Sequence, residues 1–207
     1  MTANAASPSS ATRVPRRPVA SSLRWLLATC LTAAAVAGAS AFLPLDLDER
    51  LVAAHEAAVG TVIDVDVVLR DGEPWTLVTL EVERWWRRDG APVDPAAEDD
   101  TAPTLTAAFW GGRAPGAPAL QVAGVPTFAV GERVLWLLRA ADDGLGAPTV
   151  GVTQGVWRAV AGRWQGDDGS VLGVDGDGRL TLTGDALPDA TLFEALDAAY
   201  RDLEEAP

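Results

Sequence analysis

The residues that usually perform catalysis are scarce in this sequence. His55 is the only histidine and Cys30 the only cysteine, so the chain cannot form an internal disulfide or bind zinc through several histidines. A serine or cysteine nucleophile needs a neighbouring base, and His55 is the only side chain of that type, in a segment whose spacing predicts a helix. We therefore interpret His55 as an ordinary polar position of that helix and predict no catalytic residue, no metal site and no cofactor.

Acidic residues offer two further kinds of chemistry. Asp175-Gly176-Asp177-Gly178 begins like a calcium-binding loop, but Arg179 stands at its fifth position and Ala186 at its twelfth, where oxygen ligands are required. Asp-Gly pairs are typical of tight hairpin turns, and we interpret the segment as one. Two carboxylates could also hydrolyse a glycosidic bond, but among 29 acids the sequence singles out no pair.

Tryptophan is frequent, with 8 residues against one Tyr and four Phe. Trp85 and Trp86 are neighbours on a predicted strand and point to opposite faces, so if Trp86 is buried, Trp85 lies outside or beneath a loop. Exposed tryptophan rings stack on sugars or anchor interfaces. We therefore predict a binding surface that consists of Trp85, Trp110, Val125, Pro126 and Phe128, together with the loop 111–118. The alternative is that the turns near Gly124 and Gly131 only set the register of the strands.

The first 41 residues have the pattern of a secretory signal peptide. They contain four Arg and no acid, an apolar run over 25–37, and the small residues Ala39 and Ala41 of an A-x-A cleavage site. The alternative is an uncleaved membrane anchor over 25–41, with the rest of the chain outside. Both interpretations predict a domain that is secreted or exposed on the cell envelope, and cleavage would remove Cys30.

The charge of the chain excludes some partners. The formal net charge is -13, and all 16 bases are Arg. Binding to nucleic acid needs clustered positive charge, so we expect no nucleic-acid partner. The domain after residue 41 is even more acidic than the whole chain, so we expect it not to bind an anionic membrane.

Short strands dominate the predicted elements. Asp46 and Glu49 have the spacing of a capping box at the start of the first helix. Alternation places Val78, Leu80, Val82 and Trp86 on one face of a strand, and Val134–Leu138 is apolar on both faces, as in a central strand. The segment 87–103 is rich in Pro, Ala and acids and predicts a disordered loop. The expected elements are a helix over 46–58 that Gly60 ends, strands over 61–69, 75–86, 105–110, 134–138, 149–153 and 155–161, a hairpin over 171–182, and a helix from Pro188.

These elements predict a mainly β fold, a small antiparallel barrel or sandwich with one N-terminal and one C-terminal helix, formed by residues 42–207 as a single domain.

The middle of the chain resembles a family of uncharacterised exported bacterial proteins. The resemblance covers about residues 47–160 and rests on Phe109-Trp110-Gly111-Gly112, on Val122 to Leu137 with its G-x-P-x-F-x-x-G-E-R-V-L pattern (here Val125-Pro126-Thr127-Phe128 within it), and on Gln154-Gly155 followed by Val160. The chain departs from that family at Trp110 and at Val156-Trp157. The helix-plus-barrel layout is also similar to netrin-like domains and tissue inhibitors of metalloproteases, which have OB-type barrels. Those inhibitors bind zinc through an N-terminal Cys, which the predicted mature chain lacks.

We therefore expect an exported, non-catalytic β-domain that binds a protein or a cell-envelope polymer. Two alternatives stay open: a carboxylate-dependent hydrolase that acts on envelope glycans, and a regulator of an exported protease.

Overall fold

The computed structural model describes residues 43–88, 90–93, 102–140, 147–182 and 184–205. The chain divides after Ala41, and Phe42–Pro207 form one compact unit. The predicted signal peptide or anchor, with Cys30, lies outside the described residues. Among the described residues, no helix has the length and apolar character needed to cross a membrane.

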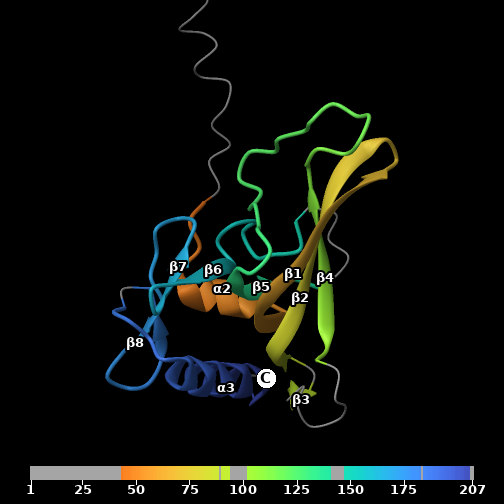
Figure 1. Cartoon of the computed structure of the whole chain (residues 1–207). Coiled ribbons are helices and arrows are strands. Elements are labelled where there is room, and N and C mark those ends of the chain that lie inside the picture. The colour runs from red at the N-terminus through yellow and green to blue at the C-terminus, as the bar shows by residue number, and fades with distance from the viewer. Residues whose placement is uncertain (1–42, 89, 94–101, 141–146, 183, 206–207) are drawn as a thin grey trace, which may run out of the picture. The chain divides into compact units, whose positions relative to one another are not determined.

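The fold is mainly β, as predicted, with one helix near the start of the unit and one at its end (Figure 1). A seven-stranded antiparallel sheet is accompanied by a small two-stranded one. The elements are α2 (Leu47–Ala53), β1 (Glu56–Arg70), β2 (Glu73–Arg87), β3 (Gly90–Val93), β4 (Thr104–Trp110), β5 (Arg133–Leu138), β6 (Val156–Val160), β7 (Arg163–Gly166), β8 (Gly173–Val174), β9 (Leu180–Thr181) and α3 (Asp189–Glu205).

The large sheet is open. Its strand order is β3-β2-β1-β5-β6-β7, and β4 pairs with the same side of β2 as β3, closer to the tip of the hairpin. In the described part of the chain no ladder joins β4 to β7, so the sheet does not close on itself. Of the two predicted layouts, barrel or sandwich, the closed OB-type barrel is therefore not formed. Sequence patterns specify strands but not the long-range pairing that would close them.

Both faces of the sheet are covered at its centre, and β5 shows this directly. Leu135 and Leu137 belong to a cluster with α2 and α3, which we call the helix-side cluster. Val134, Trp136 and Leu138 belong to a second cluster on the opposite face, the loop-side cluster. The prediction that 134–138 is a central strand, buried on both faces, is confirmed.

Two bulges change the predicted faces of the hairpin formed by β1 and β2. The register passes from Val59–Arg84 to Gly60–Val82, which leaves Glu83 as an extra residue. Beyond this bulge the faces are exchanged: Val82 lies in the loop-side cluster and Trp86 in the helix-side cluster, although alternation predicted one face for both.

A second shift, between Val62 and Asp64, makes Ile63 the extra residue and leaves it 43% exposed. Val62, the residue before it, is buried instead.

The first helix is shorter than predicted. Its capping box is confirmed, with Asp46 Oδ1 accepting from the Glu49 amide at 2.7 Å and Glu49 Oε2 accepting from the Asp46 amide at 2.9 Å. The helix ends at Ala53, so His55 is not helical. Its amide donates to the Leu138 carbonyl and its carbonyl accepts from the Arg88 amide. Alanine favours helices, but pairing with β2 and β5 takes the segment from Glu56 onward into β1.

The remaining predictions met mixed outcomes. The strand 105–110, the hairpin 171–182 and the C-terminal helix are confirmed. β3 lies inside the segment predicted as a loop, whose residues 94–101 are outside the described ranges. The segment 149–153 forms a single bridge at Thr149 in place of a strand, and β7 was not predicted.

Candidate functional site

The outer half of the β1–β2 hairpin, together with β4, carries apolar side chains on the face that points away from the loop-side cluster. Val78, Leu80 and Phe109 face the loop-side cluster. Their neighbours along each strand point to the opposite face, because side chains alternate. The apolar members of that opposite face, which we call the outer hairpin face, are Val68, Trp75, Leu77, Ala108 and Trp110.

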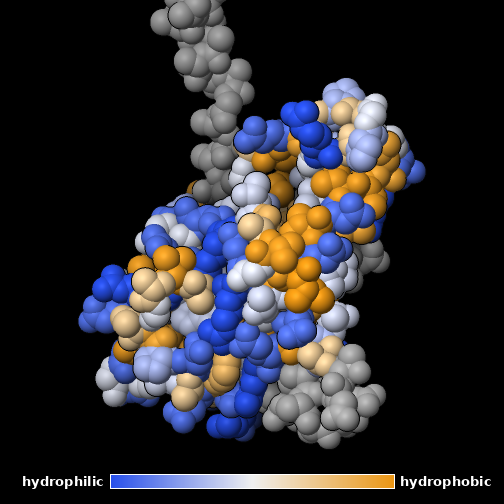
Figure 2. Space-filling model, in the orientation of Figure 1, coloured by the Kyte–Doolittle hydropathy of each residue, from blue (hydrophilic) through white to orange (hydrophobic). Residues whose placement is uncertain are grey.

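These five residues are neighbours through the strand register. Trp75 pairs with Val68 on one side and with Trp110 on the other, and Leu77 pairs with Ala108. All five are partly exposed. Figure 2 shows hydrophobic surface gathered over the outer part of the β1–β2 hairpin.

The helices contact the other end of this hairpin. Asp197 on α3 accepts hydrogen bonds from Arg84 at 3.1 Å and from the Trp86 indole at 2.6 Å. Arg84 is nine positions along β2 from Trp75, or about 30 Å at the usual rise of a strand. Figure 1 shows the hairpin tip extending away from α2 and α3. The helices that cover the sheet at its base therefore leave its outer half open.

Acidic side chains border the apolar residues on the same face. Asp66 lies opposite Leu77, Asp64 opposite Thr79, and Glu81 opposite Thr104, and all three acids are exposed. Within the described residues, neither Asp64 nor Glu81 forms a salt bridge. Arg70 lies over the Trp75 ring, with 5.7 Å from the guanidinium carbon to the ring centroid. Apart from this arginine at the tip, the face is apolar and negatively charged.

β4 adds a free strand edge to this face. The Pro103 carbonyl accepts from the Val82 amide, and the Gly111 amide donates to the Pro74 carbonyl. Because antiparallel hydrogen bonds alternate, Leu105, Ala107 and Phe109 direct their backbone groups toward β2. The residues that direct their N–H and C=O groups away from β2 are Thr104, Thr106, Ala108 and Trp110. No described strand pairs with that edge.

The residues predicted as a binding surface fall into three places. Trp110 is on the outer hairpin face. Phe128 lies in the loop-side cluster, with ring centroids 4.9 Å from Phe109 and 5.3 Å from Trp136. Val125 packs against the same cluster, and Pro126 is buried beside it in sequence. The structure thus brings Val125, Pro126 and Phe128 together as a cover of the core, on the opposite side of β4 from Trp110.

Trp85 is separate from both groups. Its indole N–H donates to Glu56 at 3.0 Å, and Arg87 lies 4.3 Å over its ring. It packs against the loop-side cluster at the base of β2. Trp85 is therefore already occupied by partners within the chain.

Sequence reasoning missed Trp75 and Leu77. Their signal was present, because Trp75 and Leu77 share odd-numbered positions with Thr79 and Glu81 on the side of the predicted strand opposite Val78 and Leu80. A tryptophan and a leucine are unusual on an otherwise polar strand face, and together they indicate a contact surface.

In the described part of the chain, no three His, Cys, Asp or Glu side chains gather around a possible metal position. Burial raises the pKa of Tyr200 far above its ordinary range, so this phenol stays protonated. No family model, curated protein or solved structure matches this chain.

Proposed function

We propose that this chain is an exported, non-catalytic domain that binds a partner protein through the outer hairpin face and the free edge of β4. The observation that carries the proposal is an apolar, aromatic sheet face that is continuous with an unpaired strand edge. Such edges are templates for an added strand, and monomeric proteins normally protect them with charges, prolines or bulges. β4 has none of these along its seven residues, Thr-Leu-Thr-Ala-Ala-Phe-Trp.

Charge selects the kind of partner. A second copy of the chain would bring together two molecules of net charge -13, which opposes self-association. The exposed carboxylates of Asp64, Asp66 and Glu81 favour a partner that carries positive charge. The occupant that fits is an extended segment of another protein that directs both apolar residues and Lys or Arg to this one face, at every second position of its sequence.

Thr106 gives a sharp test of strand addition. Its N–H points to the free edge, so Thr106→Pro removes an outward donor without removing a backbone hydrogen bond to β2. The hydrogen bond between the Thr106 and Thr79 hydroxyls, at 3.0 Å, is lost in Thr106→Pro and in Thr106→Ala alike. Thr106→Ala is the matched control, because it keeps the N–H. We would measure binding of a synthetic peptide, the Val-Lys peptide, to the full chain by isothermal titration calorimetry. In this peptide Val and Lys take turns at every second position, with Thr between them, so that Val and Lys share one face of the added strand. The Val-Glu peptide, of the same length with Glu in place of Lys, is measured beside it.

We expect the Val-Lys peptide to bind the parent protein and T106A alike, and the Val-Glu peptide to bind neither. T106P should weaken binding by about tenfold or more, which corresponds to one or two backbone hydrogen bonds. If T106P does not fold, by circular dichroism, Leu77→Glu on the same face replaces it with the same expected loss. Equal binding of both peptides, undiminished binding to the variant, or a dimer in analytical ultracentrifugation would each overturn the proposal.

A further inference from the structure

A second, unrelated surface feature lies between the helices. α2, the β8–β9 turn and α3 enclose a hollow of about 390 Å³, within the range of small-molecule sites. Its floor is apolar and includes Leu51, Leu180, Ala199 and Leu203. Leu51 is 7% exposed, so the floor is continuous with the helix-side cluster.

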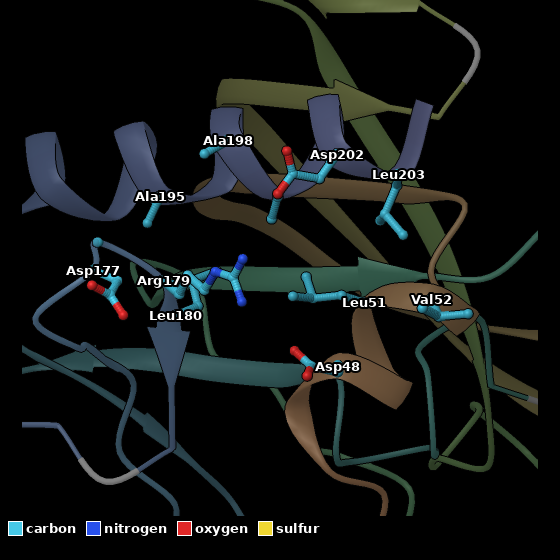
Figure 3. A pocket seen from close by; sticks show the side chains of 12 residues that line it. Asp48, Leu51, Val52, Asp177, Arg179, Leu180, Ala195, Ala198, Asp202 and Leu203 are labelled. Carbon is cyan, nitrogen blue, oxygen red and sulfur yellow. The ribbon is translucent and has the colours of Figure 1, made fainter. Parts of the chain in front are cut away.

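The hollow also holds separated charges of both signs. Arg179 lines it, together with the carboxylates of Asp48, Asp177 and Asp202. In Figure 3 the Arg179 guanidinium points into the space between the helices, with Asp202 on the α3 side and Asp48 on the α2 side. Within the described residues none of these four side chains forms a salt bridge, so each charge is available to a ligand.

The turn before Arg179 holds it in place. Asp175 Oδ1 accepts from the amides of Asp177 and Arg179, both at 2.9 Å, and Gly178 supplies the positive φ of 81° that the turn needs. The guanidinium is therefore carried by a fixed backbone at the mouth of the hollow.

The end of α3 adds a preference for positive charge at the opposite wall. Asp202 and Leu203 lie in the last turn of this helix, which has no basic residue. The carbonyl end of a helix carries partial negative charge, which favours a cation. One wall thus suits an ammonium group, and Arg179 suits a carboxylate.

From this arrangement we infer that the hollow binds a small zwitterion with an apolar body, of the class of α-amino acids with apolar side chains. The carboxylate would pair with Arg179, the ammonium with Asp202 or Asp48, and the side chain would lie on Leu51 and Leu180. A ligand must carry both charges and an apolar body to contact both walls and the floor of the hollow. A simple cation or anion would contact only one wall.

Three probes with one apolar body separate these contributions. L-leucine has both charges, L-leucinamide only the ammonium and N-acetyl-L-leucine only the carboxylate. We would titrate each into the full-length protein and follow the amide signals of Ala195 and Ala199 by NMR. We expect L-leucine to bind, and each of the other two to bind about tenfold more weakly, since a charged hydrogen bond contributes roughly one such factor.

Variants assign the two charges to residues. Arg179→Gln should abolish the preference for L-leucine over L-leucinamide, and the double variant Asp48→Asn/Asp202→Asn the preference for L-leucine over N-acetyl-L-leucine. Glu194→Gln, on α3 but outside the hollow, is the matched control and should change neither preference. The absence of shifts with L-leucine, leucinamide binding as tightly as leucine, or preferences that survive both variants would overturn the inference.

Discussion

Arg50 and Asp168 show how a single charged pair is built into this fold. Arg50 is 3% exposed and donates to the carbonyls of Leu45 and Gln154 and to Asp168 at 3.0 Å. Its guanidinium carbon also lies 5.5 Å from the centroid of the Trp157 ring. A buried arginine needs such partners, because an uncompensated buried charge is strongly destabilising.

Asp168→Asn tests this pair through its pH dependence. Burial alone would raise the pKa of Asp168, but hydrogen bonds from Ser170 and Arg50 outweigh it and lower the pKa below the ordinary 3.8. The folded pKa is depressed, so the carboxylate stabilises the fold above 3.8, and this stabilisation is lost as the pH falls through the folded value.

We expect D168N to lower the free energy of unfolding at neutral pH by about 1–2 kcal/mol, less than for a fully buried pair because Asp168 is partly exposed. Urea titrations at several pH values would show the difference from the parent shrinking below 3.8. Asp185→Asn is the control, because it changes an exposed carboxylate and should leave the free energy of unfolding nearly unchanged. A difference that persists undiminished in acid would contradict this account of the pair.

Among the elements, the β1–β2 hairpin depends on a glycine at its first bulge. A Cβ on Gly60 would lie 2.4 Å from the backbone oxygen of Glu81, and backbone cannot move aside as a flexible side chain can. Gly60→Ala should therefore destabilise the protein by about 1–3 kcal/mol, the range for overpacking. Gly176→Ala is the control, because no atom lies within 4 Å of a Cβ at that position. Equal melting temperatures of the two variants would show that the bulge tolerates a side chain.

This bulge also marks the limit of prediction for the elements. Local periodicity of apolar residues was enough to find the strands β2, β4 and β5 and the helix α3. Each of these elements is defined by the spacing of its own apolar residues. Local periodicity failed at Glu83 and Ile63, where an extra residue exchanges the faces, and at Gly60, which looked like the end of a helix. The position of a bulge depends on how two strands pair, and the sequence of one strand alone does not specify that pairing.

For the whole molecule, sequence reasoning predicted the fold class but not the open sheet. The pairing of β5 with both β1 and β6 joins segments far apart in the chain, and β4 is left at an edge by the same arrangement. The candidate surface shows the same limit. Trp110 was named from composition, but Trp75 became its neighbour only through the β2–β4 register.

Hydrogen exchange at β4 tests the central claim most directly. In the free protein the amides of Leu105, Ala107 and Phe109 should exchange slowly, because they bond to β2, and those of Thr106, Ala108 and Trp110 should exchange fast. Adding the Val-Lys peptide should slow the second set at least tenfold at saturation and leave the first set nearly unchanged. If the outward amides exchange equally fast with and without bound peptide, or are already protected in the monomer, the free edge of β4 is not the binding site.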